Sequence, residues 1–347
     1  MTRAVQCGSV QIGGGAPVSI QSMTNTDTRD VAATAAQIKK LQQAGCEIIR
    51  LAIPDMAAAK AFGEIRKEVD IPMVADIHFD YRLAIAAIEN GAHKIRINPG
   101  NIGGRDKVTA VVRAAREHGI PIRVGVNSGS LEKDILKRDG GVTASGLVES
   151  ALRQVKVLED MNFRDIVISL KSSDVKMNTE AYRLISSKCD YPLHIGVTEA
   201  GTPEVGKIKS AVGLGTLLLE GIGDTMRVSL TGDPVEEVLT ARKILAAAGL
   251  RKEAINFVSC PTCGRTRVDL VNIAQEIEEA VSTLKPSREI TVAVMGCEVN
   301  GPGEAREADI GVACGSGKGI IFSRGETIKT VDESKITEEI VKMVREI

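Results

Sequence analysis

Three cysteines in the last third of the chain have the type and spacing of metal ligands. Only Pro-Thr separates Cys260 from Cys263, and Cys297 precedes a segment rich in Gly and Pro, 298–304. Two thiols at this spacing can reach one metal centre, and a Gly/Pro turn lets the backbone wrap around a bulky cluster. The stretch Thr266–Asp269 resembles the start of a helix, whose partial positive charge stabilises thiolates. The pattern favours an iron–sulfur cluster.

Other interpretations of these cysteines remain open. A dithiol redox pair belongs in a strand–helix–strand unit, which is not indicated around Cys260. Structural zinc usually takes four Cys or His ligands, and no histidine follows His194, which leaves Cys314 to complete a zinc site. The three thiols could also be unrelated. Spacing alone favours iron–sulfur over zinc only slightly.

The fourth ligand would decide what such a cluster does. Apart from Cys314, the nearest oxygen donor in the loop after Cys297 is Glu304. A carboxylate is a weaker ligand of iron than a thiolate and can be displaced. A cluster with one displaceable ligand can bind a substrate directly, so Glu304 would make the centre catalytic.

A second group of polar side chains lies at the carboxyl ends of predicted strands. Members two residues apart, such as Arg96 and Asn98, point to the same side of a strand. The group comprises Arg50, Asp76, His78, Arg96, Asn98, Arg123, Asn127, Lys171, Glu199, Arg227 and Ser229. Its five fixed cations outnumber its two acids by three charges, and confined like charges repel unless an anion neutralises them. Because arginine forks suit phosphate oxygens, we expect a diphosphate site here.

Glu199 lies near the end of the seventh predicted strand, and two roles stay open for it: a general acid/base or a counter-ion to the arginines. The alternative for the cations is that each pairs with an acid on a neighbouring helix as a solvated rim residue. That explanation is reasonable for any one arginine but improbable for all five cations at strand ends together.

Eight short apolar strands, each followed by a helical segment, position these residues. We predict strands at Val18–Thr24, Ile48–Pro54, Pro72–Phe79, His93–Gly100, Pro121–Asn127, Asp165–Ser173, Pro192–Gly201 and Thr225–Thr231. This alternation indicates a TIM (β/α)8 barrel over residues 1–251, a fold whose chemistry sits at the carboxyl ends of its strands. A doubly wound sheet, the alternative, leaves the strand count unexplained. Gln6–Ile12 and Pro17–Gln21 flank three glycines and predict a hairpin plug, and Ser128–Gly141 predicts an inserted helix or lid.

The alternation stops near Lys252. The remaining elements are predicted as helices at Val268–Leu284 and Lys335–Ile347 and strands at Ile290–Met295, Asp309–Ala313, Gly319–Ser323 and Glu326–Val331. We therefore expect residues 252–347 to form a smaller, separate α+β domain that carries the three cysteines.

Composition narrows the class of protein. The 44 basic and 45 acidic residues give a formal charge of −1, and aromatic residues make up only 2% of the chain, which disfavours nucleic-acid and membrane-surface binding. The amino-terminal residues lack the apolar stretch of a secretory signal, and no apolar run approaches the ~18 residues of a membrane span. With an odd count of seven cysteines, we expect a cytoplasmic protein with reduced thiols.

Several long motifs resemble one known family. They are Ser19–Thr26, Ala75–Phe79, Lys94–Asn101, Thr198–Gly201, Cys260–Arg265 and Gly296–Glu304. In this order, and over nearly the whole chain, they resemble the short, two-domain form of the 4-hydroxy-3-methylbut-2-en-1-yl diphosphate synthases of the methylerythritol phosphate pathway of isoprene biosynthesis.

The resemblance implies an iron–sulfur oxidoreductase that opens and dehydrates 2-C-methyl-D-erythritol 2,4-cyclodiphosphate with two electrons, delivered singly by ferredoxin or flavodoxin. It implies a [4Fe–4S] cluster held by Cys260, Cys263, Cys297 and Glu304, the last leaving when substrate arrives. It makes Glu199 a candidate proton donor, and it implies a homodimer with a cross-subunit active site. The diphosphate is then expected among Arg50, His78, Arg96, Asn98, Arg123, Asn127, Lys171, Arg227 and Ser229.

This expectation leaves the role of one cysteine open and has two alternatives. Cys314 is not among the ligands that the resemblance assigns, so its role is open. A metal-free barrel acting on a phosphorylated or pterin-like substrate, with a zinc-stabilised accessory domain, is one alternative. A zinc-bound interaction protein is the other, and the five cations at strand ends oppose it.

Overall fold

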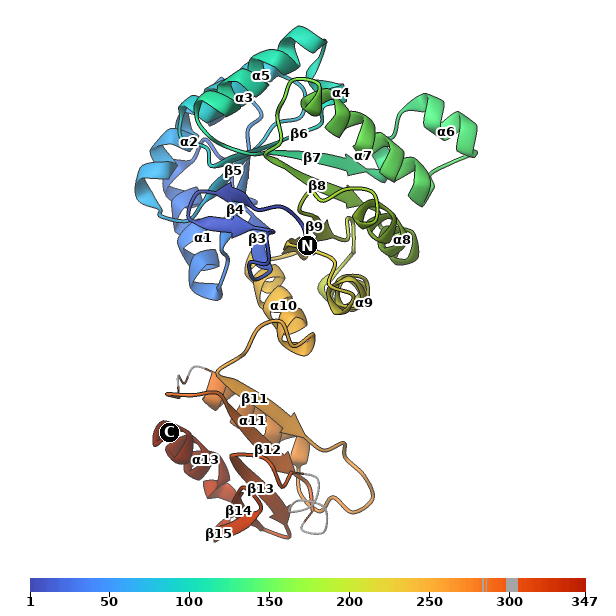
Figure 1. The fold of residues 1–347 in the computed structure, drawn as a ribbon. Helices are drawn as coiled ribbons and strands as arrows, with labels where there is room; N and C mark the ends of the chain where they lie inside the picture. The colour runs from blue at the N-terminus through green and yellow to red at the C-terminus, as the bar shows by residue number, and fades with distance from the viewer. Residues whose placement is uncertain (283, 285, 298–304) are drawn as a thin grey trace. The chain divides into compact units, whose positions relative to one another are not determined.

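The chain folds into two compact units, Met1–Arg251 and Lys252–Ile347, in a computed structural model that describes residues 1–282, 284, 286–297 and 305–347 (Figure 1). The division falls at the position where the sequence analysis expects the domain boundary. In the described part of the chain, no helix combines the length and apolarity needed to cross a lipid bilayer.

The first unit is a TIM barrel of eight parallel strands in chain order, as the sequence predicted (Figure 1). Its strands are β3 (Ser19–Met23), β4 (Ile48–Ala52), β5 (Met73–Asp76), β6 (Lys94–Ile97), β7 (Ile122–Asn127), β8 (Ile166–Lys171), β9 (His194–Gly196) and β10 (Thr225–Arg227). β10 pairs with β3, and the ring closes between β8 and β9, where Ile168 bridges to Leu193 and donates its backbone N–H to Pro192 O at 2.9 Å. The buried Tyr182 hydroxyl adds to this closure by donating to His194 O at 2.6 Å.

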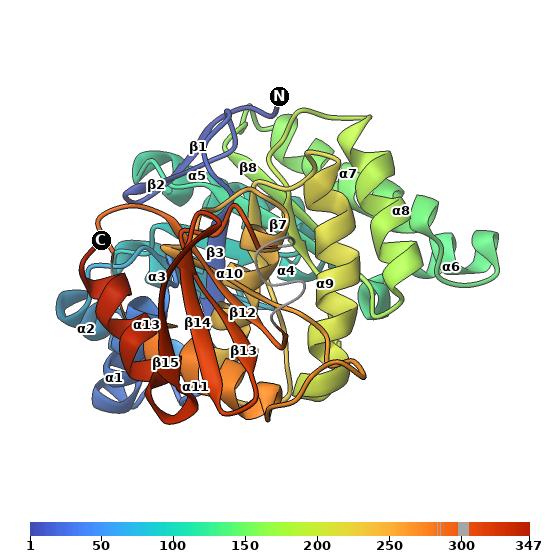
Figure 2. The ribbon, with the colours of Figure 1, turned by 90° about the horizontal axis from the view of Figure 1, so that it is seen from below.

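Helices surround the strands on the outside. They are α1 (Val31–Ala44), α2 (Met56–Glu68), α3 (Tyr81–Glu89), α4 (Pro99–Ile102), α5 (Arg105–Glu117), α7 (Ala144–Glu159), α8 (Val175–Ser186), α9 (Pro203–Leu219) and α10 (Pro234–Ala247). Aspartates that accept from the first-turn backbone begin several of them, including Asp30, Asp55 and Asp174. The expected insertion forms η1 (Ser128–Ser130) and α6 (Lys133–Asp139), and α6 projects away from the helical ring in both views (Figures 1 and 2).

A short hairpin closes the amino end of the barrel, but the predicted pairing of its strands was wrong. β1 (Val5–Cys7) pairs with β2 (Val10–Ile12) around a tight turn, whereas the segment after the three glycines becomes barrel strand β3. Gly8 allows the tight turn, with φ of 57°. Apolar residues of the hairpin pack against the first or second residue of three barrel strands in one cluster: Val5, Cys7, Ile12, Ile48, Val74 and Val167.

The second unit is a five-stranded mixed sheet in the order β11 (Ile255–Ser259), β12 (Ile290–Met295), β13 (Ile310–Gly315), β14 (Lys318–Ser323) and β15 (Glu326–Asp332). β11 was not predicted as a strand. Helices α11 (Leu270–Ser282) and α13 (Ile336–Arg345) share one apolar cluster with alternate residues of the sheet, and η2 (Glu333–Lys335) leads into α13. β11, β12 and β13 run parallel, so β11 and β12 end at the same edge.

Candidate active site

The strands of the barrel place apolar side chains outward and mostly polar side chains into the lumen. Ile95 and Ile97 of β6 belong to the core under the helices, whereas Lys94 and Arg96 alternate with them and face inward. The other strands of the barrel show the same alternation of outward and inward side chains. The inward positions of the barrel strands include Gln21, Met23, Arg50, Asp76, Lys94, Arg96, Arg123, Asn127, Ser169, Lys171, His194, Thr225 and Arg227. A TIM barrel usually fills this space with branched aliphatic side chains, so the polar lumen is the unusual feature of this fold.

A buried carboxylate organises one side of the lumen. Asp76 lies 3.3 Å from Arg96 Nη1, 3.7 Å from Arg50 Nε and 3.5 Å from His78 Nε2. Burial acts to raise the pKa of Asp76, but the nearby Arg50, His78 and Arg96 outweigh it and hold the pKa well below its usual range. Asp76 therefore stays ionised and fixes two of the predicted phosphate-binding arginines.

Two further cations, Arg123 and Lys171, face the lumen, and the charge of Asp76 reaches Arg123. Arg123 is buried, and its Nε and Nη1 have no hydrogen-bond partner within the described ranges. Burial, then the charges of Arg50 and Arg96, lower the pKa of Arg123 well below its usual value. Burial and Arg123 do the same to the pKa of Lys171. Burial and the neighbouring cations together account for both shifts.

Glycines let the cations lie across the lumen. A Cβ at Gly125 would lie 2.8 Å from Arg96 Nε, and a Cβ at Gly196 would lie 2.7 Å from Lys171 Nζ. Both distances are shorter than real Cβ contacts, so a side chain at either position would displace a cation.

Sequence reasoning missed two members of this site. Glu237 on α10 is buried and pairs with Arg227, with 3.2 Å between Oε2 and Nη2. The Met23 sulfur lies 2.8 Å from Arg50 Nη2 and 3.5 Å from Arg227 Nη1. The sequence holds no signal that separates Glu237 from its neighbour Glu236, which is half-buried and paired with Lys207. Met23 could have been found, since it is the last residue of a strand whose alternate positions face inward.

The remaining predicted residues lie nearer the rim. Asn98 caps α4 by accepting from Gly100 N at 3.0 Å, and Asn127 ends β7 beside Lys171. The side chain of His78 is 59% exposed. Ser229 is half-buried just after β10. Glu199 is exposed in the loop after β9, with φ of 51°, a left-handed conformation that a non-glycine residue rarely adopts.

In the second unit, the parallel pairing of β11 and β12 brings two cysteine segments together. Ser259 is level with Val294, and Cys260 N donates to Val294 O at 3.2 Å. The Cys260 Sγ then accepts from Gly296 N at 3.1 Å, one residue before Cys297. The two thiol-bearing segments therefore leave the sheet side by side.

The third cysteine segment folds back onto the same point. Cys263 N donates to Thr266 Oγ1 at 3.3 Å, and a Cβ at Gly296 would lie 3.0 Å from that oxygen. Cys263 is exposed, and hydrogen bonds from the backbone and side chain of Arg265 lower the pKa of its thiol. All three cysteine segments thus meet around Gly296, an arrangement that fits a shared metal centre.

The described residues do not by themselves complete a metal site, because no three His, Cys, Asp or Glu side chains among them lie close enough to hold an ion. The predicted ligand Glu304 lies outside the described residues. Cys314 is fully buried in the cluster under α11 and α13 with Val312, on the helix side of β13. Burial raises the pKa of this thiol to about 12, and Cys260 packs against the same cluster.

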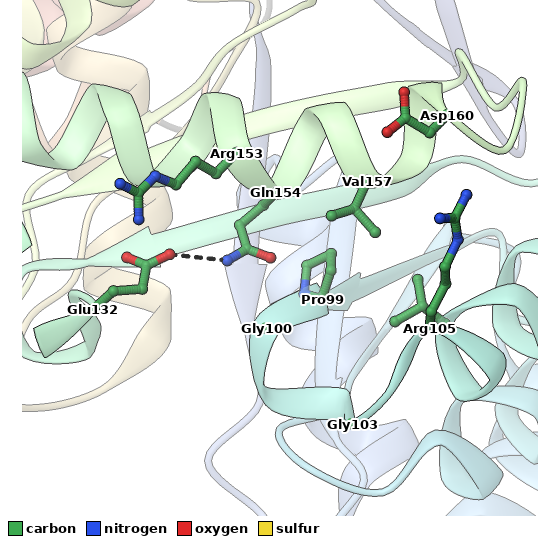
Figure 3. Close-up of a pocket in the computed structure, with 10 residues that line it drawn as sticks. Pro99, Gly100, Gly103, Arg105, Glu132, Arg153, Gln154, Val157 and Asp160 are labelled. Carbon is green, nitrogen blue, oxygen red and sulfur yellow. Dashed lines mark hydrogen bonds between the residues drawn. The ribbon is translucent and has the colours of Figure 1, made fainter. Parts of the chain in front are cut away.

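A surface pocket of about 380 Å³ lies between α4 and α7 and is a separate feature (Figure 3). Glu132 Oε1 accepts there from Gln154 Nε2 at 3.1 Å. The pocket lining has two cations, Arg105 and Arg153, and two carboxylates, Glu132 and Asp160. Arg153 is also paired with Asp134 at 2.7 Å and with Glu149 at 2.6 Å. The pocket therefore lacks the unmatched positive charge of the lumen and is the weaker candidate for an anionic substrate.

Both units match models of one protein family. Residues 2–242 match the GcpE TIM-barrel domain, and residues 256–346 match the GcpE protein C-terminal domain. A 4-hydroxy-3-methylbut-2-en-1-yl diphosphate synthase (flavodoxin) of Clostridium perfringens is 61% identical over 346 residues, which are 100% of this chain and 99% of the relative. A protein of the same name from Caldanaerobacter subterraneus subsp. tengcongensis is 59% identical, over 99% of this chain and 96% of its own.

Solved structures share the barrel at low sequence identity. A dihydropteroate synthase from Stenotrophomonas maltophilia covers 72% of this chain and 98% of its own with a TM-score of 0.53 and 14% identity. One from Vibrio fischeri gives a TM-score of 0.52 at 12% identity, covering 71% of this chain and 97% of its own. These similarities support the barrel fold alone.

Packing around Gly296 yields a test of the cysteine arrangement. Gly296→Ala places a Cβ 2.8 Å from Leu270 Cδ2 and should push the cysteine segments apart, lowering metal retention several-fold. The matched control is Gly264→Ala, since nothing lies within 4 Å of a Cβ there. Metal per chain is measured after anaerobic reconstitution and gel filtration. Equal metal in both variants would contradict the convergence of the three segments.

Proposed function

Because this chain belongs to the GcpE family, we propose that it forms 4-hydroxy-3-methylbut-2-en-1-yl diphosphate with electrons from flavodoxin, as the names of its relatives state. The chain is an oxidoreductase of isoprenoid precursor synthesis. Identity near 60% over both units sets aside the zinc-bound interaction protein and the metal-free barrel. The seven free thiols are consistent with a reducing compartment, and we place the reaction in the cytoplasm.

The observation that carries the substrate proposal is the unmatched positive charge of the lumen. Asp76 and Glu237 neutralise two of the five cations, and Glu199 is exposed in its loop. The remaining excess suits a cyclic diphosphate, whose phosphate oxygens can accept several N–H donors at once. We assign substrate binding to Arg50, His78, Arg96, Asn98, Arg123, Asn127, Lys171, Arg227 and Ser229.

The reaction consumes two electrons and, with the freed phosphate oxygen left as an anion, one proton. One bond between carbon and a ring phosphate oxygen breaks, and one hydroxyl group leaves as water. Every oxygen atom of the substrate is thus found in the open diphosphate or in that water. Arg96 and Arg123 would neutralise the phosphate oxygen freed by ring opening, because both already face the lumen. We propose that Glu199 supplies a proton to the departing hydroxyl, since it is the carboxylate at the mouth without a paired arginine among the described contacts.

We propose that Cys260, Cys263, Cys297 and Glu304 hold a [4Fe–4S] cluster. When bound, such a cluster supplies electrons one at a time. The role of the protein is to hold the three thiols near Gly296 and to stabilise their ionised form through N–H donors such as Gly296 N. The fully buried Cys314 is left out of this ligand set.

We also propose a homodimer with a cross-subunit active site, and α9 offers a surface for it. Apolar residues at helical spacing on α9 are 49% to 73% exposed: Val205, Ile208, Val212 and Leu219. An exposed apolar stripe on a helix is typical of an interaction surface. A second copy of this chain is the proposed occupant.

Turnover tests the function and the role of Glu199 together. The anaerobically reconstituted chain should convert the cyclic diphosphate to the open product with reduced flavodoxin or a chemical reductant. If Glu199 donates a proton, Glu199→Gln should lower kcat by ~10²–10⁴-fold with little change in KM. Glu204→Gln, on the exposed first turn of α9, is the control. No product from the unaltered chain would refute the function, and a change in KM alone would make Glu199 a counter-ion.

The ligand set is tested by two substitutions. Anaerobic protein should hold about four iron and four sulfide per chain. Glu304→Ala should keep most of that iron but alter the electron paramagnetic resonance spectrum and the activity, since a displaceable ligand is lost. Cys314→Ser should leave the spectrum unchanged. A cluster lost in Cys314→Ser but intact in Glu304→Ala would reverse the assignment.

The dimer is tested on α9. Ile208→Asp puts a charge in the exposed stripe and should shift the chain from dimer to monomer in analytical ultracentrifugation, with loss of turnover. Met56→Asp on α2 is the control, because Met56 is also exposed and apolar but lies outside the stripe. A dimer that persists in Ile208→Asp would exclude this surface.

A further inference from the structure

The amino half of the barrel lumen contains a second polar layer, below the diphosphate site. It is formed by Ser19, Gln21, Lys94, Arg123, His194 and Thr225, here called the floor cluster. The strand register connects its members: Thr225 is level with both Ser19 and His194, and Lys94 lies two residues before Arg96, which is level with Arg123. Arg123 is thus shared between the two layers, whereas the other five members belong to the floor cluster alone.

The floor cluster is closed off from below. The hairpin residues Val5, Cys7 and Ile12 pack with the strand residues Ile48 and Val74 in an apolar cluster at the amino end of the barrel. Cys7 and Lys94 are close enough for their charges to interact. Bulk water is therefore excluded on that side.

The floor cluster carries an unusual number of unused hydrogen-bonding atoms. The following buried atoms have no hydrogen-bond partner among the residues that the structure describes: Ser19 Oγ, both side-chain atoms of Gln21, Lys94 Nζ, Arg123 Nε and Nη1, both ring nitrogens of His194, and Thr225 Oγ1. Native proteins satisfy nearly all buried polar groups. The charge of Arg123 acts on Lys94, and the charges of both act on His194, so these three side chains lie near one another and one bound ligand can contact more than one of them.

The charge of the floor cluster indicates what kind of partner this is. Lys94 and Arg123 are both fully or almost fully buried, and no carboxylate belongs to the layer. Burial lowers the pKa of Lys94 to about 8, which still leaves the ammonium largely charged at neutral pH. Burial, then Arg123 and Lys171, lower the pKa of His194, so the imidazole stays neutral. The layer therefore holds two positive charges and neutral donors, which water alone would not neutralise.

We propose that the floor cluster binds a small monovalent inorganic anion of the halide class, held by Lys94 Nζ and Arg123 and by the hydroxyl and amide donors around them. This resident anion partly neutralises the lumen before a substrate arrives and fixes Arg123 from below. The proposal does not depend on the proposed reaction, because five of the six members of the floor cluster lie outside the residues assigned to substrate binding.

Crystallography with bromide is the direct test. Crystals of the full chain grown in bromide should show an anomalous scattering peak within hydrogen-bonding distance of Lys94 Nζ and Arg123. Added inorganic diphosphate should displace any bromide at the diphosphate site but leave the floor peak. Light-atom density alone at the floor, or a floor peak displaced by diphosphate, would overturn the proposal.

Thermal stability in solution provides a second test, which does not depend on crystals. Replacing gluconate with bromide at constant ionic strength should raise the Tm by about 5 °C, since a ligand that binds only the folded chain stabilises it. Lys94→Met should abolish that dependence, whereas Lys188→Met, on the surface, should retain it. A Tm that is equal in the two salts for the unaltered chain would contradict a resident anion.

Discussion

Like charges confined inside a barrel repel one another, and the arrangement of this chain follows from that repulsion. Arg50, Arg96, Arg123, Lys171 and Arg227 face a shared space that a TIM barrel would ordinarily pack with aliphatic side chains. Arginine stays protonated in proteins, so the four arginines cannot escape burial and mutual repulsion by becoming neutral. The fold tolerates the group because two buried carboxylates neutralise part of it and the rest is available to an anion.

Other features of the barrel are consequences of keeping these cations in place. Asp76 bridges neighbouring strands by pairing with Arg50 and Arg96, and Glu237 reaches in from α10 to hold Arg227. Small residues such as Gly125 leave room for guanidinium groups to cross the lumen. The apolar hairpin seals the amino end, so that charge is presented only toward the carboxyl ends of the strands. In the second unit, the ends of two parallel strands bring the three thiol-bearing segments together.

The sequence predicted all eight barrel strands, because each is a short apolar run between turn signals and helices at regular intervals. It also predicted which arginines face inward, since strand parity fixes the side on which a residue lies. It did not predict Glu237, because a helical acid near a strand end looks the same whether it is solvated or buried. The hairpin pairing was wrong because three glycines suggested the turn, whereas the turn lies at Gly8. β11 was missed since its residues are only partly buried and carry a weak pattern.

Calorimetric titration of the cyclic diphosphate into the metal-free chain, without oxygen, tests the central claim most directly, because it separates the cationic lumen from the redox centre. The account predicts binding that weakens steeply with added salt and falls by ~100-fold in Arg123→Met, where one buried cation of the lumen is removed. Arg113→Met, on the exposed face of α5, should bind as the unaltered chain does. Absence of binding, or equal affinity in Arg123→Met and the unaltered chain, would contradict the claim that the lumen is built around an anionic substrate.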